Sequence, residues 1–86
     1  MSFSIFIHPD VEKYLDSIQH DERKRCYDSL KKLSEEPFKP RSGCDIKKMS
    51  GEKTFYRLRV GDHRFLYVVK DQEVLVEEAF KREKGY

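Results

Sequence analysis

The sequence predicts an α+β fold in which a helical hairpin packs on a mainly antiparallel sheet of four to five strands. Apolar residues recur with helical spacing in the first half of the chain and alternate with polar residues from about residue 54 onward. A length of 86 residues suits one domain, so we expect residues 1–86 to form a single domain. The expected order of elements is β-α-α-β-β-β-β.

The first half of the chain is expected to contain an N-terminal strand and two helices. Residues 3–7, FSIFI, form a short apolar run that fits a buried strand. A helix start at Pro9 and the apolar spacing after it predict a helix over 9–19. Asp21 is a candidate cap for a second helix, which Pro37 ends. A tight link joins the two helices, so we expect them to form a helical hairpin.

The second half is expected to complete the sheet. A short strand around residues 46–49 follows a loop with two prolines and a glycine. Strands at about 54–60, 63–70 and 73–80 come next, because apolar and polar residues alternate there between turn signals. A two-residue turn at Gly61–Asp62 would join the first two of these three strands.

That turn determines which side chains share a face of the hairpin. It pairs Arg59 with Arg64 and Arg57 with Leu66. Like charges opposite each other cost up to about 1 kcal/mol. Two interpretations are open for the arginine face. It is either a solvated outer face whose charge is neutralised by Glu77 or Glu78 on the next strand, or a concave anion site whose arginines pack against nothing. The opposite face would be the core face, with His63 at its edge, and would carry Tyr56, Leu58, Val60, Phe65, Tyr67 and Val69.

Basic residues are concentrated in this region. Residues 1–43 carry eight basic and eight acidic side chains, whereas residues 47–67 carry six basic and two acidic ones. Guanidinium groups bind phosphate oxygens bidentately, so a cluster of arginines favours a phosphate-containing ligand. The binding properties of arginine do not distinguish between RNA, DNA and an acidic protein as the ligand. The segment AFKREKGY adds further cations and a tyrosine.

Several other classes of protein are not indicated. No apolar run approaches the roughly 20 residues that a membrane helix needs, and the first residues do not resemble a signal peptide. Cys26 and Cys44 lack CxxC spacing and are expected to be a packed thiol and a loop residue. His8, His20 and His63 lie far apart, without the spacing of a metal site. We therefore expect a cytoplasmic protein with no membrane partner, no metal and no cofactor.

The order and spacing of these motifs resemble the RelE-type toxins of the RelE/ParE superfamily. A short basic strand ending in Gly precedes an aromatic-Arg-x-Arg strand and then G-D-x-R-x-x-Y. A closing strand leads into K-R-E and a final Tyr, and the run is DIKKMSGEKTFYRLRVGDHRFLYVVKDQEVLVEEAFKREKGY. The first strand and both helices fit as well. The resemblance therefore covers the whole chain and implies a single RelE-like toxin domain.

The resemblance implies the toxin of a type II toxin–antitoxin system. Such an mRNA interferase is a ribosome-dependent endonuclease that cleaves messenger RNA in the ribosomal A site without a metal. The ribose 2′-hydroxyl attacks the adjacent phosphodiester, and positioned cations stabilise the charge of the transition state. The implied partners are the ribosome, mRNA and a RelB-like antitoxin. We expect the antitoxin to be acidic and partly disordered on its own.

The resemblance implies roles for individual residues that match the motifs of the RelE-type toxins. Arg57 and Arg59 match two basic residues of the active strand, and Arg64 matches the arginine after the turn. Arg82 matches the later catalytic arginine, and Tyr86 matches the tyrosine that stacks on the cleaved nucleotide. The lysines expected to bind RNA around these catalytic residues are Lys47, Lys48, Lys53, Lys81 and Lys84.

The sequence does not settle which residue accepts the proton of the attacking 2′-hydroxyl. RelE has lysines where this chain has Arg57 and Arg59, and an arginine cannot act as a general base because it stays protonated. Tyr86 is the main candidate for this role. His63 has a suitable intrinsic pKa, but the alternation of the strand directs it to the core side. Lys53 and Lys81 are weaker alternatives.

Two other functions remain open within this fold. The first is a ParE-like inhibitor of DNA gyrase that has no ribonuclease activity. The second is a non-catalytic RNA-binding or interaction domain. The arginine-rich hairpin, together with Arg82 and Tyr86, favours the RelE-like function over the ParE-like one.

Overall fold

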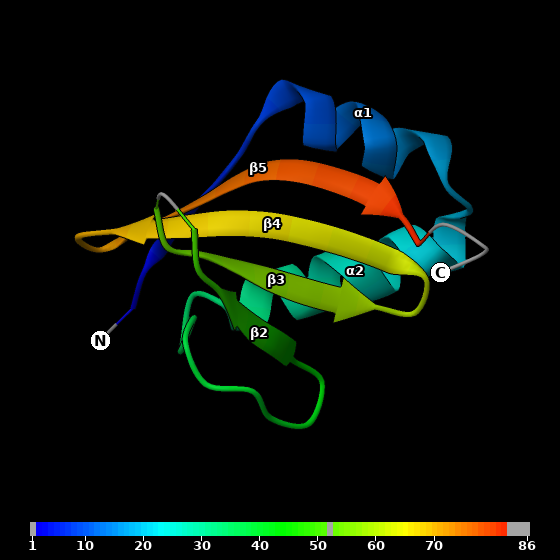
Figure 1. Cartoon of the computed structure of the whole chain (residues 1–86). Helices are drawn as coiled ribbons and strands as arrows, with labels where there is room; N and C mark the ends of the chain where they lie inside the picture. Colours follow the sequence, from blue (N-terminus) through cyan, green and yellow to red (C-terminus); the bar gives the residue numbers. More distant parts are fainter. Residues whose placement is uncertain (1, 52, 83–86) are drawn as a thin grey trace.

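The computed structural model describes residues 2–51 and 53–82 and confirms the predicted fold class and element order (Figure 1). Two helices and five strands follow one another within these residues. They are β1 (Ser4–Ile7), α1 (Pro9–Ser17), α2 (His20–Lys32), β2 (Asp45–Met49), β3 (Phe55–Val60), β4 (His63–Lys70) and β5 (Glu73–Lys81).

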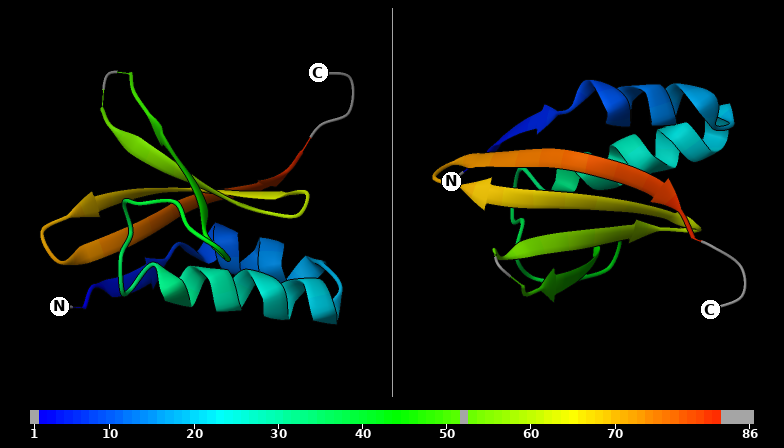
Figure 2. Two further views of the ribbon diagram at one scale, coloured as in Figure 1. Left: turned by 90° about the horizontal axis from the view of Figure 1, so that it is seen from below. Right: turned by 45° about the horizontal axis from the view of Figure 1, so that its top comes forward.

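The five strands form one sheet in the order β1-β5-β4-β3-β2. The β1–β5 pair is parallel, and the other neighbouring strands are antiparallel. Both helices lie on one side of the twisted sheet, as Figure 2 shows. No described helix covers the opposite side, which carries Arg57, Arg59 and Arg64 and which we call the open face.

The first helix begins where the sequence predicts. Pro9 occupies the start of α1, where its missing N–H removes no helical hydrogen bond. The residue before it, His8, caps the helix, because its Nδ1 accepts a hydrogen bond from the Asp10 N–H at 3.0 Å. The helix ends at Ser17, slightly earlier than the predicted boundary.

The second helix differs from the prediction at both ends. Helix α2 begins at His20 after Gln19, so the prediction that Asp21 caps it is wrong. Asp21 lies instead in the first turn, where its negative charge favours the positive end of the helix dipole. The helix ends at Lys32, well before Pro37. Within the described part of the chain, no helix is long and apolar enough to cross a membrane.

The core lies between the helices and the sheet, and the predicted core face is confirmed. Phe65 and Tyr67 are the largest fully buried side chains, and the hydroxyl of Tyr67 donates to the Pro37 carbonyl at 2.7 Å. Tyr56 and Val69 are partly buried against this core. Its other members are Val11, Leu15, Cys26, Leu30, Leu33, Cys44, Ile46, Leu58, Val60, Val74 and Val76.

Strand β1 is an edge strand and not the buried strand that its apolar run predicts. Ile5 and Ile7 pack against the core, whereas Phe6 points to the open face and is 50% exposed. The sheet order gives β1 a strand neighbour on one side only, which is β5. The run FSIFI therefore buries one of its two faces.

A β-bulge in β5 changes which side chains reach the open face. Leu66 pairs with Glu78 but the next residue, Tyr67, pairs with Val76, so Glu77 is an extra residue in β5. Beyond this bulge the alternation is shifted by one position. The shift places Phe80 opposite Arg64.

Candidate active site on the open face

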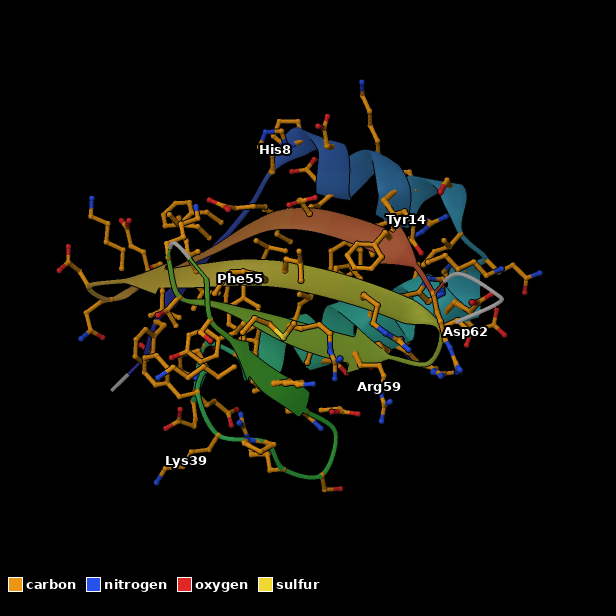
Figure 3. The ribbon with its side chains drawn as sticks, viewed as in Figure 1. His8, Tyr14, Lys39, Phe55, Arg59 and Asp62 are labelled. Atoms are coloured by element: carbon orange, nitrogen blue, oxygen red, sulfur yellow. The ribbon has the colours of Figure 1, made fainter. Side chains whose placement is uncertain are left out.

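The β3–β4 hairpin places three arginines on the open face. The observed register pairs Arg59 with Arg64 and Arg57 with Leu66, as the predicted two-residue turn requires. Gly61 in this turn has a φ of +59°, a conformation that favours glycine. Figure 3 shows Arg59 and Asp62 at the same end of the sheet. The local sequence therefore gathers the arginines beside the turn.

Arg64 is buried, which corrects the expectation that the arginines pack nothing. Its exposed fraction is 9%, and its Nη1 donates to the carbonyl oxygens of Gly61 at 2.9 Å and His63 at 3.3 Å. These carbonyl groups hold the guanidinium group in one orientation. A group held in this way is preorganised for an anion, because little reorganisation is needed when the anion arrives.

Four arginines form one electrostatic cluster. Burial lowers the pKa of Arg64 below its ordinary value, and the positive charges of Arg59, Arg57 and Arg82 lower it further. Arg82 reaches the cluster because its backbone N–H donates to the Asp62 carbonyl at 2.7 Å, which joins the end of β5 to the β3–β4 turn. Since arginines remain protonated in proteins, positive charge accumulates here.

The charge of Arg59 is partly neutralised by a residue that the sequence analysis did not assign. Asp45 in β2 pairs with Arg59 across the strands, and the two side chains form an ion pair in which both are partly exposed. The interpretation as a solvated face expects Glu77 or Glu78 to neutralise the arginines, but Glu77 contacts Lys53 at 3.6 Å instead. Extending the strand pairing to β2 would have identified Asp45.

Arg57 differs from its neighbours because part of its donor capacity is unused. Its Nε atom is buried and has no hydrogen-bond partner within residues 2–51 and 53–82. An unsatisfied buried donor costs about 1–3 kcal/mol, and a ligand oxygen could satisfy it. Lys47 pairs with Arg57 from β2 and adds a second cation to the same face.

The remaining predicted lysines are not gathered with the arginines. Lys48 pairs with Tyr56 and Lys81 pairs with His63, so both lysines project to the helix side of the sheet. Lys53 precedes β3 and forms the ion pair with Glu77. The two remaining predicted site residues, Lys84 and Tyr86, lie outside the described residues.

An aromatic ring that the sequence analysis did not assign lies next to the arginines. Phe80 pairs with Arg64 on the open face, and 43% of its surface is exposed. Exposed aromatic rings are suited to stack on unpaired nucleobases. Strict alternation from Val76 would have placed Phe80 in the core, so only the bulge in β5 reveals its position.

His63 lies on the helix side, as the alternation of the strand predicts, and only 4% of it is exposed. Its Nδ1 lies 2.5 Å from the Tyr14 hydroxyl, and its Nε2 lies 2.7 Å from Oε1 of Glu22. Both ring nitrogens therefore have partners on the helices. The ring does not face the arginine cluster, so His63 is not placed to accept a proton there.

The two cysteines are buried free thiols. Burial raises the pKa of Cys26 to about 11 and also raises the pKa of Cys44. The Sγ atom of Cys44 lies 3.9 Å from the Ser29 carbonyl oxygen, so this residue packs on α2 even though it lies in a loop. The thiolate is the reactive form, and burial suppresses it.

Among the residues that the structure describes, no three His, Cys, Asp or Glu side chains could together hold a metal ion.

Comparison with known proteins identifies the family of the chain. Residues 5–84 match the family model of the ParE toxin of type II toxin–antitoxin system, parDE. A Methanocaldococcus jannaschii protein that bears the toxin name RelE1 is 31% identical over 88 residues, and the alignment covers 100% of this chain and 97% of that protein. The chain therefore belongs to the RelE/ParE superfamily of type II toxin–antitoxin toxins.

Solved structures agree with this assignment. RelE in the archaeal RelE–RelB complex from Pyrococcus horikoshii OT3 superimposes with a TM-score of 0.84 at 29% identity, over 99% of this chain and 100% of that chain. YoeB from Staphylococcus aureus, in the structure of its dimer, has a TM-score of 0.68 at 18% identity over 100% of both chains. The YoeB likeness shows the fold alone, whereas the archaeal RelE also supports the predicted RelE-like architecture.

Proposed function

We propose that this toxin is an endoribonuclease that cleaves messenger RNA in the ribosomal A site, with residues 1–86 acting as one toxin domain. The observation that carries the proposal is the arginine cluster on the open face. Arg64 is buried and held by two carbonyl groups, and three further arginines are close enough to lower its pKa. Such a concentration of like charge is costly in the free protein and favourable when a phosphate binds.

The proposed reaction is an attack of the ribose 2′-hydroxyl on the adjacent phosphorus. The bond to the 5′-oxygen of the next nucleotide breaks, which leaves a 2′,3′-cyclic phosphate and a 5′-hydroxyl. Negative charge grows on the non-bridging oxygens, and donors already in place stabilise it most. Arg64 fits this role best because its guanidinium group is held before the substrate arrives. Arg57, Arg59 and Arg82 would bind the flanking phosphates.

The proposed proton acceptor is Tyr86. Arginine cannot take this role, and the lysine alternatives are less well placed. Lys81 projects to the helix side of the sheet, and Lys53 is paired with Glu77. A base that releases its proton to the departing 5′-oxygen would complete the reaction, so the proton taken from the 2′-hydroxyl is returned to the products.

The exposed ring of Phe80 supports a nucleic-acid substrate over a simple anion. It lies beside Arg64 on the same face. A guanidinium group that binds a phosphate and a ring that stacks on the attached base together suit one single-stranded nucleotide. We propose that Phe80 contacts a base next to the cleaved bond.

A reconstituted translation system tests this function directly. Purified toxin is added to ribosomes that carry a defined mRNA, and the 5′ ends of the products are mapped by primer extension. We expect cleavage within the A-site codon and none of the same mRNA without ribosomes. Cleavage that is equally fast on free RNA would contradict the ribosome-dependent part of the proposal.

A gyrase inhibitor is the second candidate, because the matching family model is that of ParE. A supercoiling assay with purified gyrase separates the two functions. Loss of supercoiling at toxin concentrations that leave ribosome-bound mRNA intact would favour the ParE-like function. Inactivity in both assays would favour a non-catalytic binding domain.

We also propose a RelB-like antitoxin as a protein partner. The Pyrococcus horikoshii RelE was solved in complex with RelB, and the arginine cluster here suits an acidic segment that covers it. Binding to the folded toxin raises its thermal midpoint by mass action. A thermal melt that does not shift when the protein encoded next to the toxin gene is added at micromolar excess would contradict this pairing. The proposed location of toxin, antitoxin and ribosome is the cytoplasm.

A further inference from the structure

We propose that His63 is a positioning residue that transmits the packing of both helices to the arginines of the active site. The inference rests on the proposed function only where it predicts a cleavage rate. The geometry on which it is built concerns the free protein and can be tested without any RNA.

The His63 side chain joins three elements of the fold. It starts from the first position of β4 and contacts Tyr14 in α1 and Glu22 in α2. A carboxylate only accepts hydrogen bonds, so the His63 Nε2 carries the proton that Glu22 binds. When the ring is neutral, Nδ1 accepts the hydrogen bond that the Tyr14 hydroxyl donates. Burial raises the pKa of Tyr14, and the negative charge of Glu22 raises it further, which keeps this proton on the phenol.

The backbone around His63 holds two arginines of the cluster. The His63 carbonyl and the Gly61 carbonyl accept the two hydrogen bonds from Nη1 of Arg64. Between them, the Asp62 carbonyl accepts the hydrogen bond from the Arg82 N–H. Three consecutive carbonyl groups therefore bind the Arg64 guanidinium group and the Arg82 backbone, and the direction of these carbonyl groups depends on the orientation of the turn.

The side chain and the backbone of His63 thus act on opposite faces of the sheet. On the helix side, Tyr14 and Glu22 fix the ring. On the open face, the carbonyl of the same residue contacts Arg64. Loss of the two ring hydrogen bonds would remove the contacts that anchor the start of β4 to the helices, and a displacement of about 1 Å at a reacting group lowers a rate by about 10²-fold.

This role differs from a purely structural one in what a substitution should change. Removing one partner of a buried hydrogen bond leaves the other partner unsatisfied and lowers stability whatever else the bond does, so the variants need a control that loses a similar buried bond. His63→Phe keeps a ring in the core but removes both hydrogen bonds, and Tyr14→Phe removes one oxygen atom. Tyr67→Phe is the matched control, because it removes another buried tyrosine hydroxyl, bonded to Pro37, far from the turn.

The experiment measures the Arg64 guanidinium group and the cleavage step separately. Proton–nitrogen NMR of the full chain reports the Arg64 side-chain signals, which are assigned by their loss in Arg64→Lys. We expect these signals to shift or broaden in Tyr14→Phe and His63→Phe and to stay unchanged in Tyr67→Phe. Single-turnover cleavage on programmed ribosomes should fall about 10²-fold in His63→Phe and less in Tyr14→Phe. Affinity for the ribosome should stay the same in both variants.

Each outcome decides the proposal. Unchanged Arg64 signals in the folded Tyr14→Phe and His63→Phe variants would overturn it, as would a rate loss no larger than that of Tyr67→Phe. If His63→Phe does not fold, the Arg64 signals of Tyr14→Phe decide alone. If the wild-type toxin cleaves no RNA, the proposed function fails, and the NMR comparison still tests the positioning role of His63.

Discussion

Arg59 and Arg64 lie directly opposite each other on β3 and β4, although both side chains carry a positive charge. The two charges are accommodated differently. Arg59 forms an ion pair with Asp45 at the surface, whereas Arg64 is buried and donates to two backbone carbonyl groups. Neither arrangement places a full negative charge between the two arginines. The pair is therefore suited to bind an anion from outside.

Arg64→Ala and Arg82→Ala should each reduce cleavage strongly. Loss of one preorganised donor to a developing oxyanion lowers kcat by about 10²–10³-fold. Arg64→Ala should also lower the free energy of unfolding by about 1–3 kcal/mol, because two carbonyl groups lose their donor. Single-turnover cleavage and denaturant unfolding measure the two effects. Lys48→Ala, which removes a cation from the helix side, is the control and should cleave normally. A folded Arg64→Ala protein with near-normal cleavage would show that the site is misplaced.

Asp45→Asn should strengthen anion binding with little effect on stability. A partly exposed ion pair contributes up to about 1 kcal/mol, and its loss frees Arg59 for a phosphate. We expect a several-fold tighter complex with a short single-stranded RNA at low salt, measured by fluorescence anisotropy. Asp28→Asn removes the same charge from the exposed surface of α2 and should increase the affinity for this RNA less. Equal effects of the two variants would indicate a change in net charge alone.

Phe80→Ala should weaken RNA binding, because stacking on one base contributes about 1–3 kcal/mol. Phe80→Tyr should retain most of the affinity, since a tyrosine ring also stacks. The control is Phe6→Ala, which removes a similarly exposed ring from the far strand of the open face. Anisotropy titrations of the three variants compare these effects. Equal losses in Phe80→Ala and Phe6→Ala would mean that neither ring has a specific role.

Tyr86 should be needed for cleavage, and two substitutions separate its roles. Stacking is retained in Tyr86→Phe and lost in Tyr86→Ala, whereas proton transfer is lost in both. We expect the rate of Tyr86→Ala to fall below that of Tyr86→Phe, and a pH–rate profile of Tyr86→Phe then shows whether a titrating group has been removed. A chain that ends at Gly85 and cleaves at the normal rate would exclude both roles.

The folded protein should lose stability at alkaline pH. The thiol of Cys26 has a folded-state pKa of about 11, against an ordinary value of 9.0. Its contribution is fully present below about pH 9 and is lost as the pH rises through the folded pKa, because only the unfolded thiol ionises in this window. Denaturant unfolding at pH 8 to 11 should show this decline. A Cys26→Ala variant, although less stable overall, should show a shallower one, and an equally steep decline would contradict the assignment.

The sequence by itself determined the hairpin and its two faces. A two-residue turn and strict alternation are local properties, so they place Arg57, Arg59 and Arg64 on one face and Leu58 and Phe65 on the other. The helical hairpin follows in the same way from the spacing of its apolar residues. The resemblance in motif order predicted the superfamily that the comparisons confirm.

Only the tertiary structure decided the features that depend on contacts between distant segments. The bulge at Glu77 moves Phe80 to the open face, and no local sequence pattern in β5 predicts this bulge. The burial of Arg64 depends on the turn carbonyl groups, and the position of Arg82 depends on a hydrogen bond to Asp62. The partners of His63 come from two helices that lie far away in the sequence. Alternation and turn chemistry assign a side chain to a face, but the groups that meet it there depend on how the helices and strands pack.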